Sequence, residues 1–367
     1  MEVGAGALED LVRILVTGNM GYVGPGVVAH LRASRPDAAV VGLDMGYFAP
    51  VLSDAAVLPE CRVDVQYFGD VRQPPEEALR GVDAVVQLAA ISNDPMGSRF
   101  EDATYAINHR AAVAMAARAR TAGASAFVFA SSCSVYGSAG EEARTEDAEV
   151  APLTAYARSK ILAEQDLARL ASPDFRVTCL RFATACGMSE RLRLDLVLND
   201  FVAAATTSGT IRILSDGTPW RPLIHVRDMA RAFDWAIGRD GKGGDSLMVN
   251  VGADEWNYQV RELAEAVAKV IPGVDIWVNP DAGPDRRSYR VSFERFRRLA
   301  PDHQPWCQLA DTVTELAEAL TRMGFRDANF RESSFMRLNV LASLKHRGLL
   351  DDELRWTPTV RAGRRDA

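Results

Sequence analysis

The 367-residue sequence predicts an α/β fold, in which a doubly wound parallel sheet is followed by a smaller, irregular α/β cap. Short and almost wholly apolar runs alternate with stretches of helical periodicity through the first half of the chain. This is the pattern of parallel strands joined by crossover helices. The helices bury both faces of such strands, which explains why the runs carry few polar residues. After about residue 183 the alternation weakens, and a loop rich in Pro, Gly and Asp interrupts the second half.

Each expected element follows from a local signal. The first strand, VRILVT at 12–17, ends at a glycine, and a helix over about 22–34 follows it. The other expected elements are strands at 39–44, 62–68, 83–90, 126–132, 176–182 and 211–214 (IRIL), and helices at about 101–122, 155–171, 195–208, 227–238 and 257–271.

This change of pattern divides the chain into three parts. Residues 1–182 are expected to form most of the sheet domain. Residues 183–330 are expected to form most of the cap, with some return to the sheet near 211–252. The arginine-rich stretch 331–367 has weak periodicity, so we expect a helical tail with a frayed end.

Composition and charge argue against several classes of protein. The formal net charge of −7 disfavours a nucleic-acid partner, because no basic surface outweighs the acidic side chains. No apolar stretch approaches the ~20 residues that cross a bilayer, and the N-terminus lacks the regions of a signal peptide. Five scattered cysteines without a CxxC pair predict reduced thiols and a cytoplasmic protein without a membrane partner. Five histidines without ligand spacing predict no metal site.

The segment TGNMGYVG has the spacing of a dinucleotide-binding loop. Gly18, Gly21 and Gly24 follow the first strand and open the first helix, a context that a glycine-rich turn without function lacks. Gly18 permits a tight turn, Gly21 lets the backbone approach a pyrophosphate, and Gly24 lets the helix pack on the sheet. The N-terminus of that helix offers free N–H groups to phosphates. We therefore expect residues 1–182 to form a Rossmann-type domain.

Asp44, at the tip of the second strand, indicates which dinucleotide binds. Its carboxylate is placed to accept hydrogen bonds from a ribose diol, whereas a 2′-phosphate would be repelled. The residues after it, MGYF, supply no arginine to offset that repulsion. The sequence therefore favours NAD over NADP. Asp70 and Val71, in the segment FGDV, are candidates for contact with the adenine ring, although Asp70 alone could equally be a turn residue.

TAYARSK places Tyr156 and Lys160 four residues apart and hence on one face of a helix. A free tyrosine has a pKa of ~10 and is a poor base at neutral pH. An ammonium group beside it favours the phenolate, so we expect Lys160 to lower the pKa of Tyr156. Spacing alone recurs by chance in many helices, but here it follows a dinucleotide loop, five strands and a serine cluster.

Taken together, these motifs resemble those of the extended short-chain dehydrogenase/reductase family. The match consists of TGxxGxxG, the acid that ends the second strand, GDV, LAA, SSxSVYG and YxxxK, and it extends over roughly 12–325. Within that family the set is most similar to the NAD-dependent nucleotide-sugar epimerases and dehydratases. The resemblance implies NAD contacts at Gly18, Asn19, Met20, Gly21, Tyr22, Val23, Gly24, Asp44, Asp70, Val71, Leu88, Ala89, Ala90, Asn108, Tyr156, Lys160 and Ala183.

The resemblance also implies how the catalytic residues divide their work. Ser132 would hydrogen-bond the reacting sugar hydroxyl, Tyr156 would take its proton, and Lys160 would hold the nicotinamide ribose. No GxSxG turn surrounds the serines, so a nucleophilic role for Ser132 is not expected. Cys133 and Ser134 stand where related 4,6-dehydratases carry Asp-Glu. Cys133 is therefore either a thiol acid/base in elimination or a small buried residue beside the sheet.

The substrate contacts implied by the resemblance lie mostly in the cap. Arg221 in TPWRPLIH would bind a nucleotide diphosphate, because a guanidinium offers planar paired donors to phosphates. Arg287 would be a second phosphate contact, unless PDRRSYR is only a solvated charge run. The other candidate contacts with the sugar nucleotide are Ser92, Asn93, Ser132, Thr184 and Asn199.

The sequence thus predicts an NAD-dependent epimerase of a nucleotide-diphosphate sugar, acting at C-4 through a transient 4-keto intermediate. The alternatives are a 4-ketoreductase, a dehydratase or a decarboxylase on the same scaffold, and more remotely a non-catalytic NAD-binding scaffold. Many relatives pair through two long helices, here about 101–122 and 155–171. Alanines and Met115 on the first helix would permit close approach, so we expect a homodimer.

Overall fold

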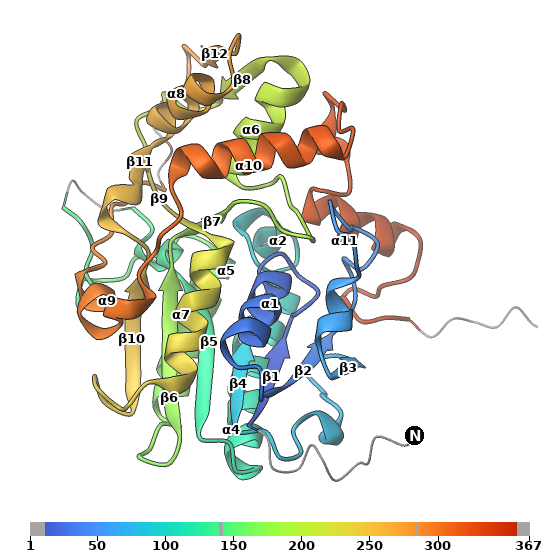
Figure 1. Ribbon diagram of the computed structural model, residues 1–367, viewed down its shortest axis with the longest axis vertical. Helices are drawn as coiled ribbons and strands as arrows, with labels where there is room; N and C mark the ends of the chain where they lie inside the picture. The colour runs from blue at the N-terminus through green and yellow to red at the C-terminus, as the bar shows by residue number, and fades with distance from the viewer. Residues whose placement is uncertain (1–11, 139–141, 284, 286, 358–367) are drawn as a thin grey trace, which may run out of the picture.

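A sheet of seven parallel strands forms the centre of the protein in a computed structural model, which describes residues 12–138, 142–283, 285 and 287–357. Figure 1 shows these strands side by side below the cap. The predicted doubly wound α/β class is confirmed, because helices cover both faces of this sheet. Its strands, in spatial order, are β10 (Ser246–Val251), β6 (Arg176–Phe182), β5 (Ala126–Ser132), β4 (Ala84–Gln87), β1 (Arg13–Thr17), β2 (Ala39–Asp44) and β3 (Val65–Phe68).

Two helices cover one face of the sheet and two others cover the opposite face. α1 (Gly24–Ser34) and α7 (Val226–Gly238) pack side by side in front of the sheet in Figure 1. α4 (Ala112–Thr121) and α5 (Ala155–Ala168) pack behind it. The apolar strand residues alternate between two cores, with Val16 on the α1 side and Leu15 on the α4 side. This double burial is the reason that the strands read as unbroken apolar runs.

The helix expected over 101–122 is confirmed, but its middle is π-helical. α3 (Glu101–Thr104) leads into a π-helical stretch at Tyr105–Ala111, and α4 follows directly. A short helix, α2 (Asp94–Arg99), precedes them, and the side chain of Asn93 caps it by accepting from the Met96 N–H at 2.9 Å. π-Helical insertions of this kind are rare in proteins, and those that occur are often found at functional sites.

The cap lies over the carboxyl ends of the parallel strands in Figure 1. The strand expected at IRIL is β8 (Thr210–Ile213), which belongs to the cap and pairs with β12 (Asp275–Val278). The strand that returns to the main sheet comes later in the chain, as β10. The other cap elements are β7 (Thr184–Cys186), β9 (Trp220–His225), β11 (Asn257–Gln259), α6 (Val197–Ser208), α8 (Val260–Val270), α9 (Glu294–Leu299) and α10 (Leu309–Arg322).

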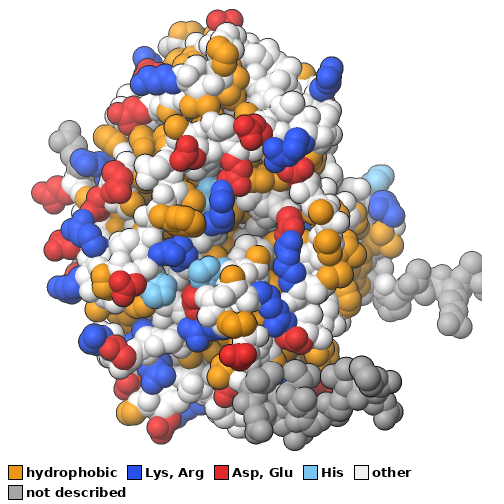
Figure 2. Space-filling model, viewed as in Figure 1, with side chains coloured by type: hydrophobic (Ala, Val, Ile, Leu, Met, Phe, Trp, Pro, Cys, Tyr) orange, Lys and Arg blue, Asp and Glu red, His pale blue; other side chains and the backbone are white. Residues whose placement is uncertain are grey.

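The chain returns from the cap to the sheet domain near its C-terminus. α11 (Arg337–His346) lies close to the edge formed by β2 and β3 in Figure 1. The frayed end expected for the tail falls beyond residue 357 and lies outside the described residues. Within the described ranges, none of the helices has the length and apolar character needed to span a membrane. The face shown in Figure 2 carries acidic and basic side chains interspersed with one another.

Candidate active site

A cavity of about 950 Å³ opens where the cap meets the carboxyl ends of the strands. This volume is at the upper end of the ~300–1,000 Å³ typical of ligand sites. The strand order reverses between β1 and β4. The chain leaves β1 toward β2 on one side and β4 toward β5 on the other, so the loops after β1 and β4 diverge and leave a crevice. Residues after β1, β2, β3, β4 and β5 line the cavity from below, and cap residues line it from above.

The glycine loop after β1 is shaped by contacts that no larger residue could make. Gly18 has φ +71°, and a Cβ there would come within 2.6 Å of the Ala89 backbone nitrogen. A Cβ on Gly24 would come within 2.1 Å of the Asn19 carbonyl oxygen. The loop therefore lies close against the neighbouring backbone and leaves its outer side open to the cavity, which it lines through Gly18, Gly21, Tyr22, Val23 and Gly24.

Two residues of the same loop are turned away from the cavity. The side-chain amide of Asn19 is buried and donates to Gln66 Oε1 at 2.6 Å. The backbone N–H of Met20 donates to Asp44 Oδ2 at 3.0 Å, and its side chain is buried. Both residues were expected to contact the cofactor, but neither lines the cavity. Their observed contacts hold the loop against β2 and β3.

Asp44 and Asp70 both line the cavity near the β2–β3 edge, as does Val71. The second carboxylate oxygen of Asp44 accepts from the Gly46 N–H at 2.7 Å. Burial raises the pKa of Asp44, and these backbone hydrogen bonds oppose that rise. Asp70 is bound by the Arg72 side chain, with Nε to Oδ2 at 2.8 Å. The Asp44 side chain is thus fixed in direction at the position where a ribose diol is expected.

The loop after β4 is supported from behind by Asn108, which lies in the π-helical stretch. Leu88, Ala89 and Ala90 line the cavity. The amide of Asn108 accepts from the Ile91 N–H at 2.8 Å and donates to the Ile91 carbonyl at 2.9 Å. Asn108 is fully buried and does not reach the cavity, so the direct cofactor contact expected for it is not observed. Its contribution is to hold the loop that does line the cavity.

Ser132, Tyr156 and Lys160 come together at the cavity wall from two elements. Ser132 ends β5, while the other two lie in the first turns of α5. α5 begins where it does because Thr154 caps it, accepting from the Ala157 N–H at 3.1 Å. Lys160 Nζ donates to the Ala130 carbonyl at 2.7 Å and lies 5.7 Å from the centre of the Tyr156 ring. The grouping expected from the sequence is therefore present in space.

The expected lowering of the tyrosine pKa is not observed. Burial raises the pKa of Tyr156 to about 12, although a hydrogen bond with Ser132 lowers it in part. Burial also lowers the pKa of Lys160 to about 7. Both shifts have one cause, because the enclosed site disfavours the charged form of either group. Because Lys160 Nζ lies 5.7 Å from the centre of the Tyr156 ring, we expect the charge of either group to affect the titration of the other.

This pairing predicts how activity depends on pH. Below pH ~7 Lys160 is protonated and Tyr156 is a neutral phenol, so the phenol cannot accept a proton. As the pH rises through ~7 the pair loses one proton, and it can then exist as phenolate with ammonium. We expect kcat/KM to rise about tenfold per pH unit below ~6 and to level off above ~8. Rates measured from pH 5.5 to 9 test this; a flat profile would contradict it, and Lys160→Met should remove the inflection.

Cys133 follows Ser132 but points away from the cavity. Its thiol is 1% exposed and donates to the Arg181 carbonyl at 3.1 Å. Burial raises the pKa of the thiol well above its usual value, so it is neither a ready base nor a ready acid. Of the two alternatives, burial and the bond to the Arg181 carbonyl favour a small buried residue beside the sheet over a thiol that takes part in acid/base chemistry. Ser134 lines the cavity but has no ionisable group.

A buried ion pair supports the catalytic strand and helix from below. Arg181 on β6 contacts Glu164 on α5, with Nη2 to Oε2 at 2.7 Å, and the side chains are 7% and 4% exposed. Glu164 also accepts from the Ser131 hydroxyl at 2.5 Å. Arg181 further donates to the Tyr136 hydroxyl at 3.1 Å. This network links α5, β5 and β6 directly beneath the residues expected to react.

The residues after β6 are divided between the cavity and the core. Ala183 and Thr184 line the cavity, as expected. Asn199 does not, because it is fully buried in α6. Its amide accepts from the Gly187 N–H at 3.0 Å and donates to Tyr22 Oη at 3.0 Å. The substrate contact expected for Asn199 is therefore not observed; the amide instead ties the cap to the glycine loop.

Ser92 and Asn93 line the cavity and contact two residues that sequence reasoning missed. Arg193 donates to the Ser92 hydroxyl at 2.9 Å and to Asp195 Oδ1 at 2.6 Å. Asn93 donates to Asp195 Oδ2 at 2.7 Å. The segment ERLRLD does carry a signal, since charged residues alternate with leucines in a chain region that is otherwise apolar. That alternation could have identified Arg193 and Asp195 as cavity-facing.

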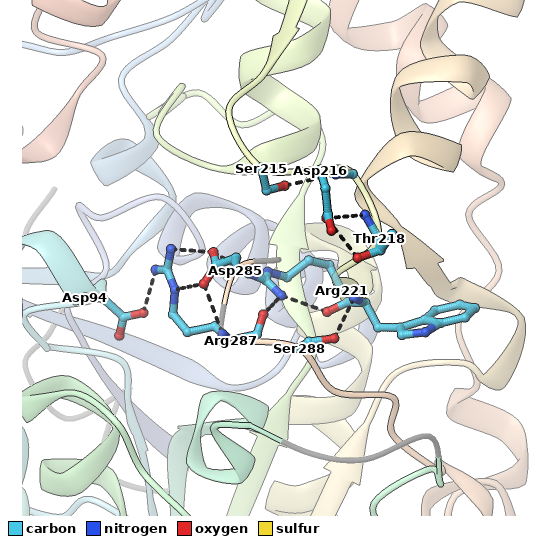
Figure 3. A network of polar contacts seen from close by, with 10 residues as sticks. Asp94, Ser215, Asp216, Thr218, Arg221, Asp285, Arg287 and Ser288 are labelled. Atoms are coloured by element: carbon cyan, nitrogen blue, oxygen red, sulfur yellow. Dashed lines mark hydrogen bonds and ion pairs between the residues drawn. The ribbon is translucent and has the colours of Figure 1, made fainter. Parts of the chain in front are cut away.

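Arg221 and Arg287 meet through a shared carboxylate, as Figure 3 shows. Arg221 Nη2 lies 3.0 Å from Asp285 Oδ2, and Arg287 Nη2 lies 2.8 Å from the same atom. Arg287 also reaches across to Asp94 at 3.1 Å. Burial alone would raise the pKa of Asp285. The hydrogen bonds and charges of these arginines outweigh that effect and lower it. Two guanidinium groups therefore converge on the cap side of the cavity, at the place where a diphosphate was expected.

The residues present fit a bound dinucleotide. The glycine loop approaches the N-terminus of α1 as closely as backbone permits. Among the described residues, the donors to the Asp44 carboxylate at the end of β2 are the backbone N–H groups of Met20 and Gly46 and no arginine. NAD would thus be held by the loops after β1, β2, β3 and β4, with its reactive end toward Tyr156 and Lys160.

The described residues contain no group of side chains that could hold a metal ion.

Comparison with known proteins agrees with this geometry. Residues 14–252 match the model of the "NAD dependent epimerase/dehydratase family". The chain is 28% identical over 275 residues to a UDP-glucose 4-epimerase of Rhizobium meliloti (strain 1021), covering 70% of this chain and 81% of that protein. It is 28% identical over 296 residues to a dTDP-glucose 4,6-dehydratase of Streptomyces griseus, covering 78% and 87%. The solved structure of MoeE5 in complex with UDP-glucose and NAD is 25% identical, with a TM-score of 0.71, and the match covers 85% of this chain and 99% of that one.

The family model matches well over half of the chain, and the motifs it includes are those that line the cavity. The chain therefore belongs to the NAD-dependent epimerase/dehydratase family.

Proposed function

We propose that this protein is an epimerase that inverts C-4 of a nucleotide-diphosphate sugar through a transient 4-keto intermediate. The observation that carries the proposal is the grouping of Ser132, Tyr156 and Lys160 at a dinucleotide cleft, with no carboxylate at Cys133 or Ser134. Several relatives are named as UDP-glucose 4-epimerases, which supports inversion at C-4. Their identities of 27–28% leave the nucleotide and the sugar open.

The protein side chains would move and hold protons during this reaction. The Ser132 hydroxyl would orient the C-4 hydroxyl of the sugar, and Tyr156 would take the proton from that hydroxyl. Lys160 would stabilise the phenolate by its charge. When bound, NAD supplies the hydride acceptor and donor, and its oxidised ring adds a positive charge that favours the phenolate.

The dehydratase alternative is opposed by the state of the acidic side chains. Elimination of water needs a carboxylic acid with a proton to give and a carboxylate to receive one. Among the described residues lining the cavity, Asp94, Asp195, Asp200 and Asp285 each contact an arginine. An arginine bound to a carboxylate occupies oxygens that would otherwise exchange a proton with the substrate. A ketoreductase remains the second candidate, because it needs the same three catalytic side chains.

Arg221 provides a test of the substrate assignment. We expect Arg221→Leu to raise KM for the sugar nucleotide about 10–100-fold with little change in kcat, because charged hydrogen bonds to the diphosphate would be lost in both ground and transition states. Steady-state kinetics measure the split between the two constants. Arg261→Leu, an exposed position in the same cap, is the matched control. An equal rise in KM in both variants, or a fall in kcat with KM unchanged, would contradict the assignment.

A homodimer and a cytoplasmic location are also part of the proposal. α4 and α5 pack against each other on one face of the sheet and expose Ala114 and Leu162. Met115, expected at the contact, is instead fully buried in the core beneath α4, so a dimer would form through the small residues beside it. Light scattering on the purified protein tests the oligomeric state.

An assay for reduced nicotinamide separates the epimerase from the ketoreductase. An epimerase restores its NAD in each turnover, so absorbance of reduced nicotinamide stays constant while the sugar isomerises. A ketoreductase consumes one reduced nicotinamide per sugar. Steady consumption during turnover would therefore reject the epimerase in favour of the ketoreductase.

A further inference from the structure

The C-terminal segment 330–357 lies against the part of the cavity where the adenosine of NAD is expected. Trp356 Nε1 donates to the Met45 carbonyl at 2.7 Å, directly after β2. Arg72, in the loop after β3, donates from Nη1 to the Glu353 carbonyl at 2.7 Å. These two contacts lie on either side of Asp44 and Asp70, the acids of the β2–β3 edge that line the cavity. Residues about 300 positions distant in sequence thus contact the loops after β2 and β3, on the side of the sheet where Figure 1 shows α11.

Arg337, the first residue of α11, enters the cavity from that segment. It is 1% exposed and belongs to the cavity wall. Its guanidinium lies over the Phe48 ring, 4.3 Å from the ring centre, and one end donates to the Arg191 carbonyl. Among the described residues its Nη1 has no hydrogen-bond partner. A buried guanidinium with a spare donor is costly unless an anion or polar group joins it.

The surroundings of Arg337 are positively charged. Burial, and then the charge of Arg193, lower its pKa to about 9, so it remains a cation at neutral pH. Arg193 is 5% exposed and is paired with Asp195. Arg191, which is buried and paired with Glu60, also acts on Arg337, so three buried guanidinium groups stand near two paired carboxylates. This imbalance favours a bound anion at this place.

The glycine loop lies beside these arginines. The Tyr22 carbonyl accepts from the Ser189 hydroxyl at 2.6 Å, and the Tyr22 hydroxyl donates to the Gly187 carbonyl at 2.6 Å. The chain that carries Arg193 is thus hydrogen-bonded to the loop that opens α1. The N-terminus of α1 is where the fold binds a pyrophosphate.

We propose that Arg337 and Arg193 bind the pyrophosphate of NAD together with the N-terminus of α1, and that segment 330–357 retains the cofactor by closing over its adenosine half. A pyrophosphate could also come from the sugar nucleotide. NAD is favoured because Arg337 packs on the loop after β2, whereas Arg221 and Arg287 converge near Asp94, at the start of α2. The inference depends on the cofactor and not on the reaction at C-4.

Binding to the full-length protein, stripped of cofactor, tests the proposal by titration calorimetry. We expect Arg337→Met to weaken binding of NAD and of ADP-ribose about 10–100-fold, as loss of a charged hydrogen bond does. Adenosine and UDP should bind as they do to the unchanged protein. Arg347→Met, an exposed position after α11, is the matched control and should change none of the four affinities. Unchanged NAD affinity would overturn the proposal, and weaker UDP binding with intact NAD binding would assign Arg337 to the substrate.

Two further measurements keep the proposal testable if Arg337→Met does not fold. Arg337→Gln retains a donor toward the Arg191 carbonyl but removes the charge, and the same outcomes apply to it. In the unchanged protein, NAD should slow hydrogen exchange of the α11 amides, while UDP alone should not. Exchange in α11 that is insensitive to NAD would show that the segment does not close over the cofactor.

Discussion

Tyr156→Phe should lower kcat about 10²–10⁴-fold, the usual contribution of a positioned acid/base group. The substitution removes only the hydroxyl. The rest of residue 156 stays packed against α2, where a Cβ added to Gly97 would lie 3.0 Å from the Tyr156 Cβ. Ser132 and Lys160 would remain in place to orient the sugar and the cofactor. Single-turnover kinetics, with the sugar followed by NMR, measure the loss in the step itself.

Two controls identify this loss as chemical. NAD content and the affinity for the sugar nucleotide should stay within about twofold of those of the unchanged protein, because the phenol hydroxyl is assigned to proton transfer. Tyr105→Phe removes a hydroxyl of the same kind from the neighbouring π-helical stretch, where it accepts from Arg158 at 3.1 Å. It should leave kcat nearly unchanged. Full turnover by Tyr156→Phe would remove the mechanism.

Arg181→Met should destabilise the protein by about 3–5 kcal/mol, because it leaves the Glu164 carboxylate buried without its partner. Methionine preserves much of the apolar volume, so the loss reports mainly on the charge and its hydrogen bonds. The midpoint of urea unfolding, read at constant slope, measures the change.

An exposed pair provides the matched comparison. Arg158→Met breaks the contact with Glu101, where the side chains are 44% and 54% exposed. Pairs of this kind contribute about 0–1 kcal/mol. If Arg181→Met and Arg158→Met lowered the free energy of unfolding by similar amounts, that would contradict the view that the Arg181–Glu164 network holds α5 to the sheet.

Much of the fold could be predicted because its strands are buried on both faces. β5 and β6 have the bounds expected from their apolar runs, 126–132 and 176–182. The pairing of later strands could not be predicted, since β8 and β10 carry similar short apolar runs. β8 remains in the cap and β10 joins the main sheet. Only the long-range packing of the cap decides between these positions.

The side chains of the site were predictable where a motif fixes the backbone, and less so elsewhere. Ser132 and Tyr156 follow from strand and helix positions, but the direction of the neighbouring Cys133 depends on the turn after β5. Asn199 lies on a helix whose buried face could not be assigned from periodicity, because α6 is apolar over most of its length. Arg337 stands in FMRLNV, and an arginine among apolar residues was its only signal.

The most direct test follows one deuterium atom through the reaction. The purified protein, without added cofactor, is incubated with UDP-, dTDP-, GDP- and CDP-glucose deuterated at C-4, and the products are identified by NMR. We predict that at least one of these becomes an equilibrium mixture of C-4 epimers that retains deuterium at C-4. A product that has lost water, or turnover only with stoichiometric reduced nicotinamide, would contradict the account.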